Sequence, residues 1–248
     1  MLSASSDMLS RIRSHGYVHL KNGITLHQIE AINSEHKKAW LEQIAAGKIK
    51  QDTSDPLHSL FPPIRDLHYD NPTIRDFVLS PALFQLMEFL IGEEPLIITT
   101  NYYYYGPGMR GMNFHQDNYG IGVSPGTCYA LWIGLDQAAL SYNCLRFAKN
   151  TESLTLLSPE ELSLKYPGNR MDHPVQYEDV ETAPGDFVIY NGQIVHATTD
   201  NTTDTHIRRS LVIHYAPRSA EKLVLNFNKL LNRNGEKVKK RADFSSRQ

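Results

Sequence analysis

The second half of the chain is a succession of strand-like runs with no regular helical pattern between them. Four runs rich in β-branched and aromatic residues follow one another, each bounded by Gly, Pro or Asn. They span residues 95–106, 127–135, 185–191 and 208–217. Parallel strands need long crossover connections, usually helical, and such helices are missing past Gly106. The pattern therefore predicts a mainly β protein with an antiparallel core.

The first part of the chain carries helical patterns instead. Thr25 and Gln28 are typical of a capping box, and apolar residues recur at helical spacing until Gly47 ends the run. A long loop is expected from Lys48 to Asp70, and a further helix from roughly Ala82 to Ile91. We therefore expect helices packed against the β core.

The length of 248 residues is compatible with one domain. We expect a helical layer mostly in residues 1–94, a β core in about 95–217 and a basic C-terminal tail in 218–248 that is solvated.

Charge and composition exclude several classes of partner. The net charge of -2 favours neither nucleic acid nor an anionic membrane. No secretory signal and no apolar run of membrane-spanning length is evident. Two cysteines, Cys128 and Cys144, are too few for a disulfide framework. We expect a cytoplasmic protein that acts on a small molecule, and the oligomeric state is not indicated.

Two His-x-Asp triplets occur, and their contexts differ. His68-Tyr69-Asp70 stands before Asn71-Pro72, where Asp70 can cap a turn or the following helix. His115-Gln116-Asp117 instead follows a tyrosine-rich strand and a Gly-rich bend. In extended backbone, residues two apart point to the same side, so this segment can offer an imidazole and a carboxylate to one ion.

His196 is the best candidate for a third ligand, because it lies near the end of a strand that begins at a Pro-Gly turn. Two His and one carboxylate on one face of an octahedral ion are typical of non-haem Fe(II) oxygenases. A structural zinc site would use four ligands, usually with thiolates. We interpret His206 as solvated, and His214 as a structural core histidine in preference to a functional one.

Arg208 and Arg209 open the last predicted core strand, twelve residues past His196. Adjacent strand residues face opposite sides, so only one arginine can point into the barrel. Periodicity does not choose between them, since both faces carry apolar residues. A buried guanidinium needs a carboxylate, which a dicarboxylate co-substrate would supply.

The segments "NFHQDNYG" and "APGDFVIYNGQIVHATTDNTTDTHIRRSLVIHYAP" resemble the phytanoyl-CoA dioxygenase family. The resemblance extends to "IRSHGYVHLKNGITLHQIEAI" and "SPALFQLMEFLIGEEP", and so covers most of the chain up to about Pro217. It implies a double-stranded β-helix, a jelly-roll core of the cupin type, with Fe(II), 2-oxoglutarate and O2.

The resemblance also implies roles for individual residues. His115, Asp117 and His196 match the iron ligands, and Arg208 matches the arginine that binds the far carboxylate of 2-oxoglutarate. Thr198 and Trp132 fall where the family often has a hydroxyl near that carboxylate and an aromatic residue beside the pocket, so we assign both to co-substrate binding.

One segment departs from the family pattern. Where an acidic-Asn-Gly step and Pro-Gly-Ser-His are usual, this chain has "SYNCLRFAKNTE". That segment commonly lies near the substrate, so the departure bears on the substrate and not on the iron. Tyr105, Asn118, Tyr119 and Arg146 could touch substrate, with a structural role as the alternative for each.

The sequence therefore predicts an Fe(II)- and 2-oxoglutarate-dependent dioxygenase that oxidises, and by default hydroxylates, a small molecule with release of succinate and CO2. Two alternatives are a non-catalytic small-molecule or metal-binding member of the same barrel fold and a cupin-type metalloenzyme that does not use 2-oxoglutarate.

Overall fold

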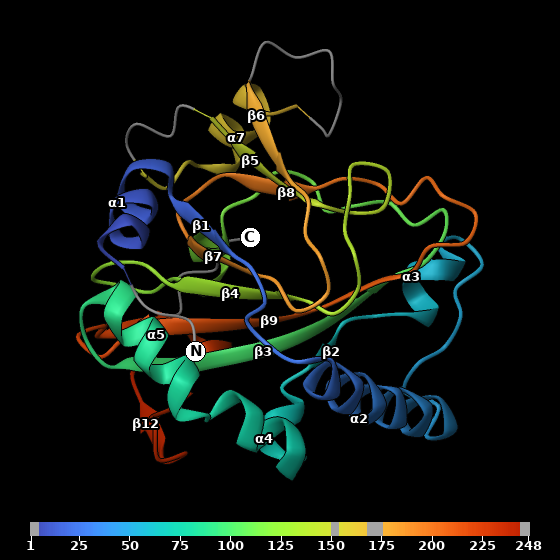
Figure 1. The fold of residues 1–248 in the computed structure, drawn as a ribbon, viewed down its shortest axis with the longest axis horizontal. Coiled ribbons are helices and arrows are strands. Elements are labelled where there is room, and N and C mark those ends of the chain that lie inside the picture. Colours follow the sequence, from blue (N-terminus) through green and yellow to red (C-terminus); the bar gives the residue numbers. More distant parts are fainter. Residues whose placement is uncertain (1–4, 150–153, 168–175, 244–248) are drawn as a thin grey trace.

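The computed structural model describes residues 5–149, 154–167 and 176–243. Two antiparallel sheets face each other, a large one and a small one, and helices cover the outer face of the large sheet (Figure 1). The expected mainly β jelly-roll core with N-terminal helices is confirmed. No helix among these residues is both long and apolar enough to cross a membrane.

The large sheet has eight strands in the order β1-β7-β4-β9-β3-β11-β12, with β2 also paired to β3. Their bounds are β1 (Tyr17–Leu20), β7 (Phe187–Asn191), β4 (Tyr129–Gly134), β9 (Arg208–Pro217), β3 (Pro95–Tyr105), β11 (Lys229–Leu231), β12 (Lys237–Lys239) and β2 (Ile64–Arg65). The small sheet has the order β6-β5-β8, with β6 (Tyr177–Val180), β5 (Leu145–Ala148) and β8 (His196–Thr198). A separate parallel pair joins β10 (Lys222–Val224) to β13 (Arg241–Asp243).

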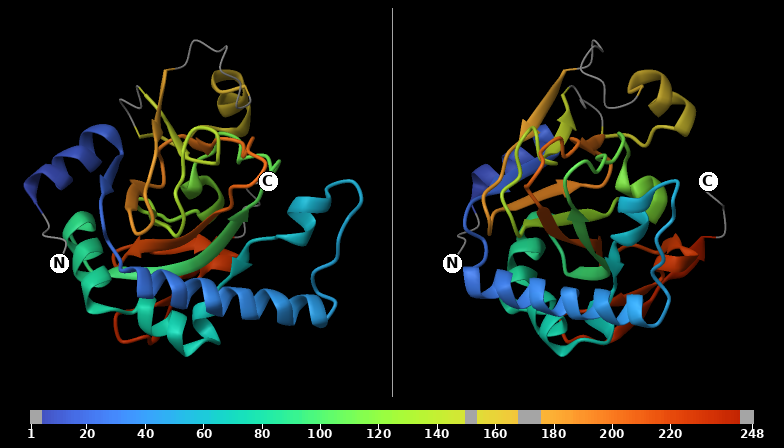
Figure 2. Two further views of the ribbon diagram at one scale, coloured as in Figure 1. Left: turned by 45° about the vertical axis from the view of Figure 1, so that its right-hand side comes forward. Right: turned by 90° about the vertical axis from the view of Figure 1, so that its right-hand side faces the viewer.

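The helices are mostly N-terminal, and Figure 2 shows α2, α4 and α5 along the large sheet. Their bounds are α1 (Ser6–His15), α2 (Leu26–Ala45), α3 (Pro56–Leu60), α4 (Pro72–Val78), α5 (Pro81–Ile91), α6 (Asp117–Ile121) and α7 (Pro159–Lys165), with 3-10 turns at Leu67–Tyr69 and Leu225–Phe227. The predicted capping box of Thr25 and Gln28 is present at the start of α2. Gly92 ends α5 with φ of 87°, as the sequence predicted.

Strand alternation creates two apolar layers on opposite faces of the large sheet. On β4, Leu131 and Ile133 face the helices, whereas Ala130 and Trp132 face the small sheet. The outer layer includes Ile32, Ile74, Phe84, Met87, Ile189 and Ile213. The inner layer joins the large sheet to the small one, for example through Tyr190 of β7 and Phe147 of β5, whose ring centroids are 5.5 Å apart. The space between the two sheets is where polar side chains can be enclosed.

Several expectations about boundaries were wrong. Residues 1–94, expected to be mostly helical, include β1, which pairs with β7 in the large sheet. The predicted loop from Lys48 to Asp70 contains α3, β2 and a 3-10 turn. Asn71, and not Asp70, caps α4, because its side chain accepts a hydrogen bond from the Ile74 amide.

The predicted basic tail is also a correction, because residues 222–243 form four strands and β11 extends the large sheet beyond β3. In the edge strand β12, the exposed Lys237 and Lys239 flank the partly buried Val238. Counting charge alone hid a period of two that is typical of an edge strand with one buried face. Residues 244–248 lie outside the described residues.

Asp186 ties the N-terminal segment to the core and gives a stability prediction. Its buried carboxylate accepts hydrogen bonds from the Asn22 amide, the Ala183 amide and His19 Nε2, at 2.9 to 3.1 Å. We expect Asp186→Asn to lower the free energy of unfolding by about 3 kcal/mol in urea denaturation, because amide donors are left poorly matched. The exposed Asp204 provides the control, and Asp204→Asn should change little.

The Asp186 contribution should also depend on pH. Burial acts to raise the pKa of Asp186, but its hydrogen bonds outweigh burial and lower the pKa below its ordinary value. The stabilisation is then fully present above the ordinary carboxyl pKa of about 4 and is lost as pH falls through the lower, folded-state pKa. A wild-type advantage over Asp186→Asn that grows on acidification would contradict this assignment.

Candidate metal centre

The loop that follows β3 is hydrogen-bonded to β8 and carries His115, the first candidate ligand. The Met112 amide donates to Thr198 Oγ1 at 2.8 Å, and the Thr198 amide donates to the Met112 carbonyl at 3.1 Å. Gly111 permits this approach, since a Cβ there would lie 2.2 Å from the Thr198 carbonyl oxygen. The loop therefore reaches the strand of His196 in a fixed register.

Reciprocal backbone hydrogen bonds place His115 beside His196. The His115 amide donates to the His196 carbonyl at 2.8 Å, and the His196 amide donates to the His115 carbonyl at 3.0 Å. Directly opposed residues in such a bridge project to the same side, and the two imidazole centroids are 4.2 Å apart. Residues 81 positions apart in sequence (196 − 115) thus act as one pair.

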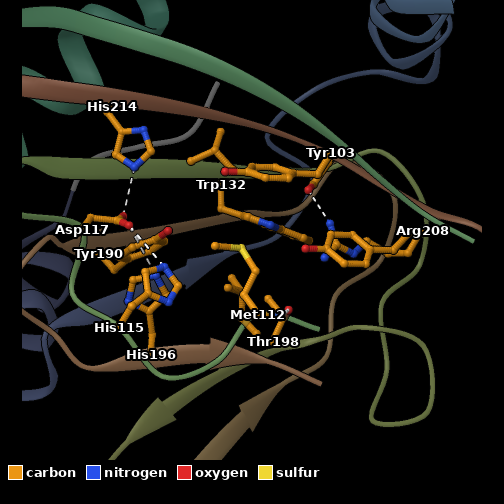
Figure 3. Close-up of a pocket in the computed structure, with 14 residues that line it drawn as sticks. Tyr103, Met112, His115, Asp117, Trp132, Tyr190, His196, Thr198, Arg208 and His214 are labelled. Carbon is orange, nitrogen blue, oxygen red and sulfur yellow. Dashed lines mark hydrogen bonds and ion pairs between the residues drawn. The ribbon is translucent and has the colours of Figure 1, made fainter. Parts of the chain in front are cut away.

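Asp117 completes a cluster at the start of α6 (Figure 3). Its Oδ1 lies 3.5 Å from His115 Nε2 and 3.7 Å from His196 Nε2. The candidate ligand atoms of the three residues all lie within 4.8 Å of one another, so one cation could contact all of them. The sequence brought these three residues forward as ligands, and the structure brings them together.

Backbone carbonyls orient both imidazoles. His115 Nδ1 contacts the Asn113 carbonyl at 2.8 Å, and His196 Nδ1 contacts the Ile194 carbonyl at 3.1 Å. A carbonyl can only accept, so each Nδ1 carries the proton and leaves the Nε2 lone pair toward the cluster. Burial and the nearby His115 lower the pKa of His196 to about 4, which keeps its imidazole neutral.

The Asp117 side chain is largely buried, at 12% exposed, yet its pKa is low. Burial alone would raise the pKa of Asp117, but His214 and His196 hold it well below its usual value. Two imidazoles and one carboxylate are the ligand set that suits a divalent first-row metal, with no thiolate contributing. The donor set therefore fits ferrous iron.

Arg208 is a second unusual group in the same space, because it is 1% exposed and has no ion pair among the described residues. Its Nε donates to the Asn143 carbonyl at 3.0 Å, and a terminal nitrogen donates to Ser210 Oγ at 2.5 Å. The guanidinium lies 4.6 Å from the centre of the Tyr105 ring. Burial lowers the pKa of Arg208 to about 10.

Arg209 differs from Arg208 in its strand face and in having an ion-pair partner. It lies on the opposite face of β9 and forms a bidentate ion pair with Asp136, at 2.7 Å for each contact. Its charge is therefore already matched. Arg208, in contrast, is a buried cation prepared for an anion that the described residues do not supply.

The cluster and Arg208 line one pocket between the two sheets. Figure 3 shows the cluster of His115, Asp117 and His196 at one end of the pocket and Arg208 at the other, with Met112 and Thr198 between them. The pocket is lined by Tyr103, Tyr105, Met112, His115, Asp117, Trp132, Leu145, Tyr190, His196, Thr198, Arg208, Ser210, Val212 and His214.

Of the tyrosine run on β3, Tyr103 and Tyr105 face this pocket. Tyr102 and Tyr104 line a separate cavity beneath α2, on the other face of the sheet. Half of the run therefore faces the metal cluster, as strand alternation requires.

The other residues singled out from the sequence divide into two groups. Thr198, Trp132 and Tyr105 line the pocket. Arg146 does not, because Leu145 takes the inward position on β5 and Arg146 pairs with Asp179 at 2.6 Å.

Asn118 and Tyr119 are also absent from the pocket lining. Asn118 is buried, and its side-chain oxygen accepts from the Val123 and Cys128 amides, which makes it a turn-forming residue. The rejected His68 is buried against Thr100, with its Nδ1 2.9 Å from the Thr100 hydroxyl.

Alternation along the strand placed His214 on the face of Arg208, where it could line the cavity, and His214 does line the pocket. Sequence reasoning favoured a structural role for it and did not anticipate the contact of its Nε2 with Asp117 Oδ2 at 2.9 Å. It also passed over Tyr103, Tyr190 and Met112 as lining residues.

A family model described as phytanoyl-CoA dioxygenase (PhyH) matches residues 12–210. The chain belongs to the phytanoyl-CoA dioxygenase family. Membership confirms the predicted class, an oxidoreductase of the iron- and 2-oxoglutarate-dependent dioxygenases, and the cluster and Arg208 fit those two groups.

Among curated relatives, a 2-aminoethylphosphonate dioxygenase from Uncultured bacterium HF130_AEPn_1 is 26% identical, over 82% of this chain and 78% of its own length. Phytanoyl-CoA dioxygenase 1 of Oryza sativa subsp. japonica is 25% identical, over 60% of this chain. The chain spans just over half the length of that relative, at 54%.

Solved structures share the fold at lower identity. The epimerase SnoN in complex with Fe3+, alpha ketoglutarate and nogalamycin RO superposes with a TM-score of 0.67 at 18% identity, covering 87% of this chain and 84% of that one. EctD from S. alaskensis, with 2-oxoglutarate and 5-hydroxyectoine, gives a TM-score of 0.67 at 16% identity, covering 88% and 78%. At these identities the likeness supports the fold.

We predict that His115→Ala and Asp117→Ala each abolish tight Fe(II) binding, because each removes one of three ligands. The measurement is an anaerobic Fe(II) titration of apo-protein. His68→Ala is the matched control, since it removes a histidine of the other His-x-Asp triplet and should leave iron binding unchanged. Tight iron binding in either cluster variant, or its loss in His68→Ala, would contradict the site.

Proposed function

We propose that this protein holds Fe(II) with His115, Asp117 and His196, holds 2-oxoglutarate with Arg208, and oxidises a small organic substrate, most simply by hydroxylation. The observation that carries the proposal is the buried, unpaired Arg208 in the same pocket as a two-His, one-carboxylate cluster. Neither feature alone would select this chemistry from the alternatives.

The argument from Arg208 is energetic. A buried charge without a partner costs several kcal/mol, so such a group persists where a ligand matches it. A planar guanidinium binds a carboxylate through two parallel hydrogen bonds. A dicarboxylate of which one end reaches the metal and the other reaches Arg208 matches both ends of the pocket, and 2-oxoglutarate is such a molecule.

The chain itself positions groups and excludes water. Iron and 2-oxoglutarate, when bound, would supply the oxidising power from O2 as 2-oxoglutarate is converted to succinate and CO2. Ser210 and the Asn143 carbonyl fix the plane of the Arg208 guanidinium. The rings of Trp132 and Tyr105 flank that guanidinium and keep its end of the pocket apolar.

A small substrate is supported by the position of the pocket between the two sheets, where it must also hold the co-substrate. One relative is named for a small molecule, 2-aminoethylphosphonate, and the EctD structure is described with another, 5-hydroxyectoine. Tyr105, which lines the pocket, stays a proposed substrate or co-substrate contact. For Arg146, Asn118 and Tyr119, the structural contacts described above favour the structural role.

We further infer a cytoplasmic location. Cys128 and Cys144 are both buried and unpaired, and a reducing compartment preserves thiols and ferrous iron alike.

The two alternatives make different use of the pocket. A non-catalytic module is expected to have lost a metal ligand or the arginine, and a cupin-type metalloenzyme that does not use 2-oxoglutarate would not need Arg208 without an ion pair among the described residues. Both features are present together, which favours the oxygenase.

A testable prediction concerns the binding of 2-oxoglutarate. Adding 2-oxoglutarate to the anaerobic Fe(II) protein should produce a visible charge-transfer band, and Arg208→Ala should raise the 2-oxoglutarate concentration needed by roughly 10²- to 10³-fold, as expected for the loss of a buried ion pair. Arg209→Ala is the matched control and should keep the wild-type requirement, because Arg209 is bound by Asp136.

Three results would count against the proposal. No band with iron bound would favour the cupin-type metalloenzyme. No iron binding would favour the non-catalytic module. A larger effect of Arg209→Ala than of Arg208→Ala would mean that the opposite face of β9 binds the co-substrate.

A further inference from the structure

The two oxygens of the Asp117 carboxylate have different partners. Oδ1 faces His115 and His196, at 3.5 and 3.7 Å from their Nε2 atoms. Oδ2 points the other way and contacts His214 Nε2 at 2.9 Å (Figure 3). The carboxylate is thus held from both sides, by the cluster on one oxygen and by a single histidine on the other.

His214 lies on a strand that is paired on both sides. Strand β9 is central, and His214 is aligned with Thr99 of β3 on one side and with Ala130 of β4 on the other. A residue paired on both sides cannot shift without disrupting two ladders. The imidazole is 6% exposed, so its position is fixed by packing as well as by the strand.

His214 is not itself part of the ligand cluster. The group whose ligand atoms all lie within 4.8 Å of one another comprises His115, Asp117 and His196. Its contact with Asp117 is a hydrogen bond from an imidazole N–H to an ionised oxygen. The other ring nitrogen, Nδ1, is buried and has no hydrogen-bond partner among the described residues. The Asp117 contact is therefore the polar interaction that accounts for a histidine at this position.

We propose that His214 is a positioning residue for the metal site: it binds the second oxygen of Asp117, so that the carboxylate offers one oxygen to the cation in a fixed direction. The inference rests on the metal site proposed above. Hydrogen-bond partners of ligating side chains commonly contribute a factor of 10 to 100 in metal affinity. A carboxylate released from His214 could also turn both oxygens toward the cation and compete with 2-oxoglutarate for positions on it.

The test is anaerobic Fe(II) titration of apo-protein, followed by 2-oxoglutarate, in wild type, His214→Ala and His214→Gln. We expect His214→Ala to raise the Fe(II) Kd by about 10- to 100-fold and to weaken the charge-transfer band at saturating iron. We expect His214→Gln to recover most of the affinity, because its side-chain amide can donate to Asp117 from a similar reach. Co(II) absorption provides a second readout of the ligand field that does not depend on turnover.

His36 gives a matched control for the loss of a buried imidazole. It is 1% exposed, its Nδ1 bonds to the Ile32 carbonyl, and its Nε2 has no partner among the described residues. It stacks on Tyr102, on the face of the sheet away from the cluster. His36→Ala should lower the melting temperature of metal-free protein yet keep the wild-type Fe(II) Kd.

The outcomes separate the inference from the proposed function. Wild-type protein that binds no iron would overturn the metal site itself. Wild-type protein that binds iron, with a folded His214→Ala of equal Kd, would overturn only the role of His214. If His214→Ala does not fold, His214→Gln and His214→Asn decide, since Asn is too short to reach Asp117: tight binding by Gln alone supports the role, and equal binding by both contradicts it.

Discussion

The pair of backbone hydrogen bonds between His115 and His196 is the interaction on which the site depends. It joins a loop leaving β3 to the short strand β8 and makes two imidazoles neighbours. Because the bonds are between main-chain atoms, the arrangement follows from the path of the chain and not from the side chains. A few residues before His115, the same loop is held against β8 by the close approach of Gly111 to Thr198 and by the hydrogen bond from the Met112 amide to Thr198 Oγ1. The pairing of the loop with β8 is therefore fixed ahead of the candidate ligands.

Strand β9 links this cluster to the rest of the pocket. Its inward residues are all polar or small apart from Val212, and they run from Arg208 through Ser210 to His214. One end of the strand thus presents a cation for a carboxylate, and the other end holds Asp117. On its outward face, Leu211, Ile213 and Tyr215 belong to the apolar layer beneath the helices. Because side chains alternate along β9, one face of the strand lines the pocket and the other packs in the apolar layer that supports it.

Local signals in the sequence were sufficient for much of the fold and for bringing forward the candidate metal ligands. The capping box at Thr25, the β-rich runs and the His-x-Asp spacing each reflect a short-range rule. The predictions that failed depended on contacts between residues distant in sequence. Arg146 forms an ion pair with Asp179 of another strand, and the partner of His214 is 97 residues away. No local pattern encodes such pairings. The strands after Pro217 were missed because their charges masked a period of two.

The most direct test is a crystal structure of the protein grown anaerobically with Fe(II) and 2-oxoglutarate, with anomalous scattering measured at the iron edge. The account predicts one iron peak bounded by His115, Asp117 and His196, and 2-oxoglutarate whose far carboxylate lies on Arg208. An iron peak elsewhere, or 2-oxoglutarate bound without Arg208, would contradict it.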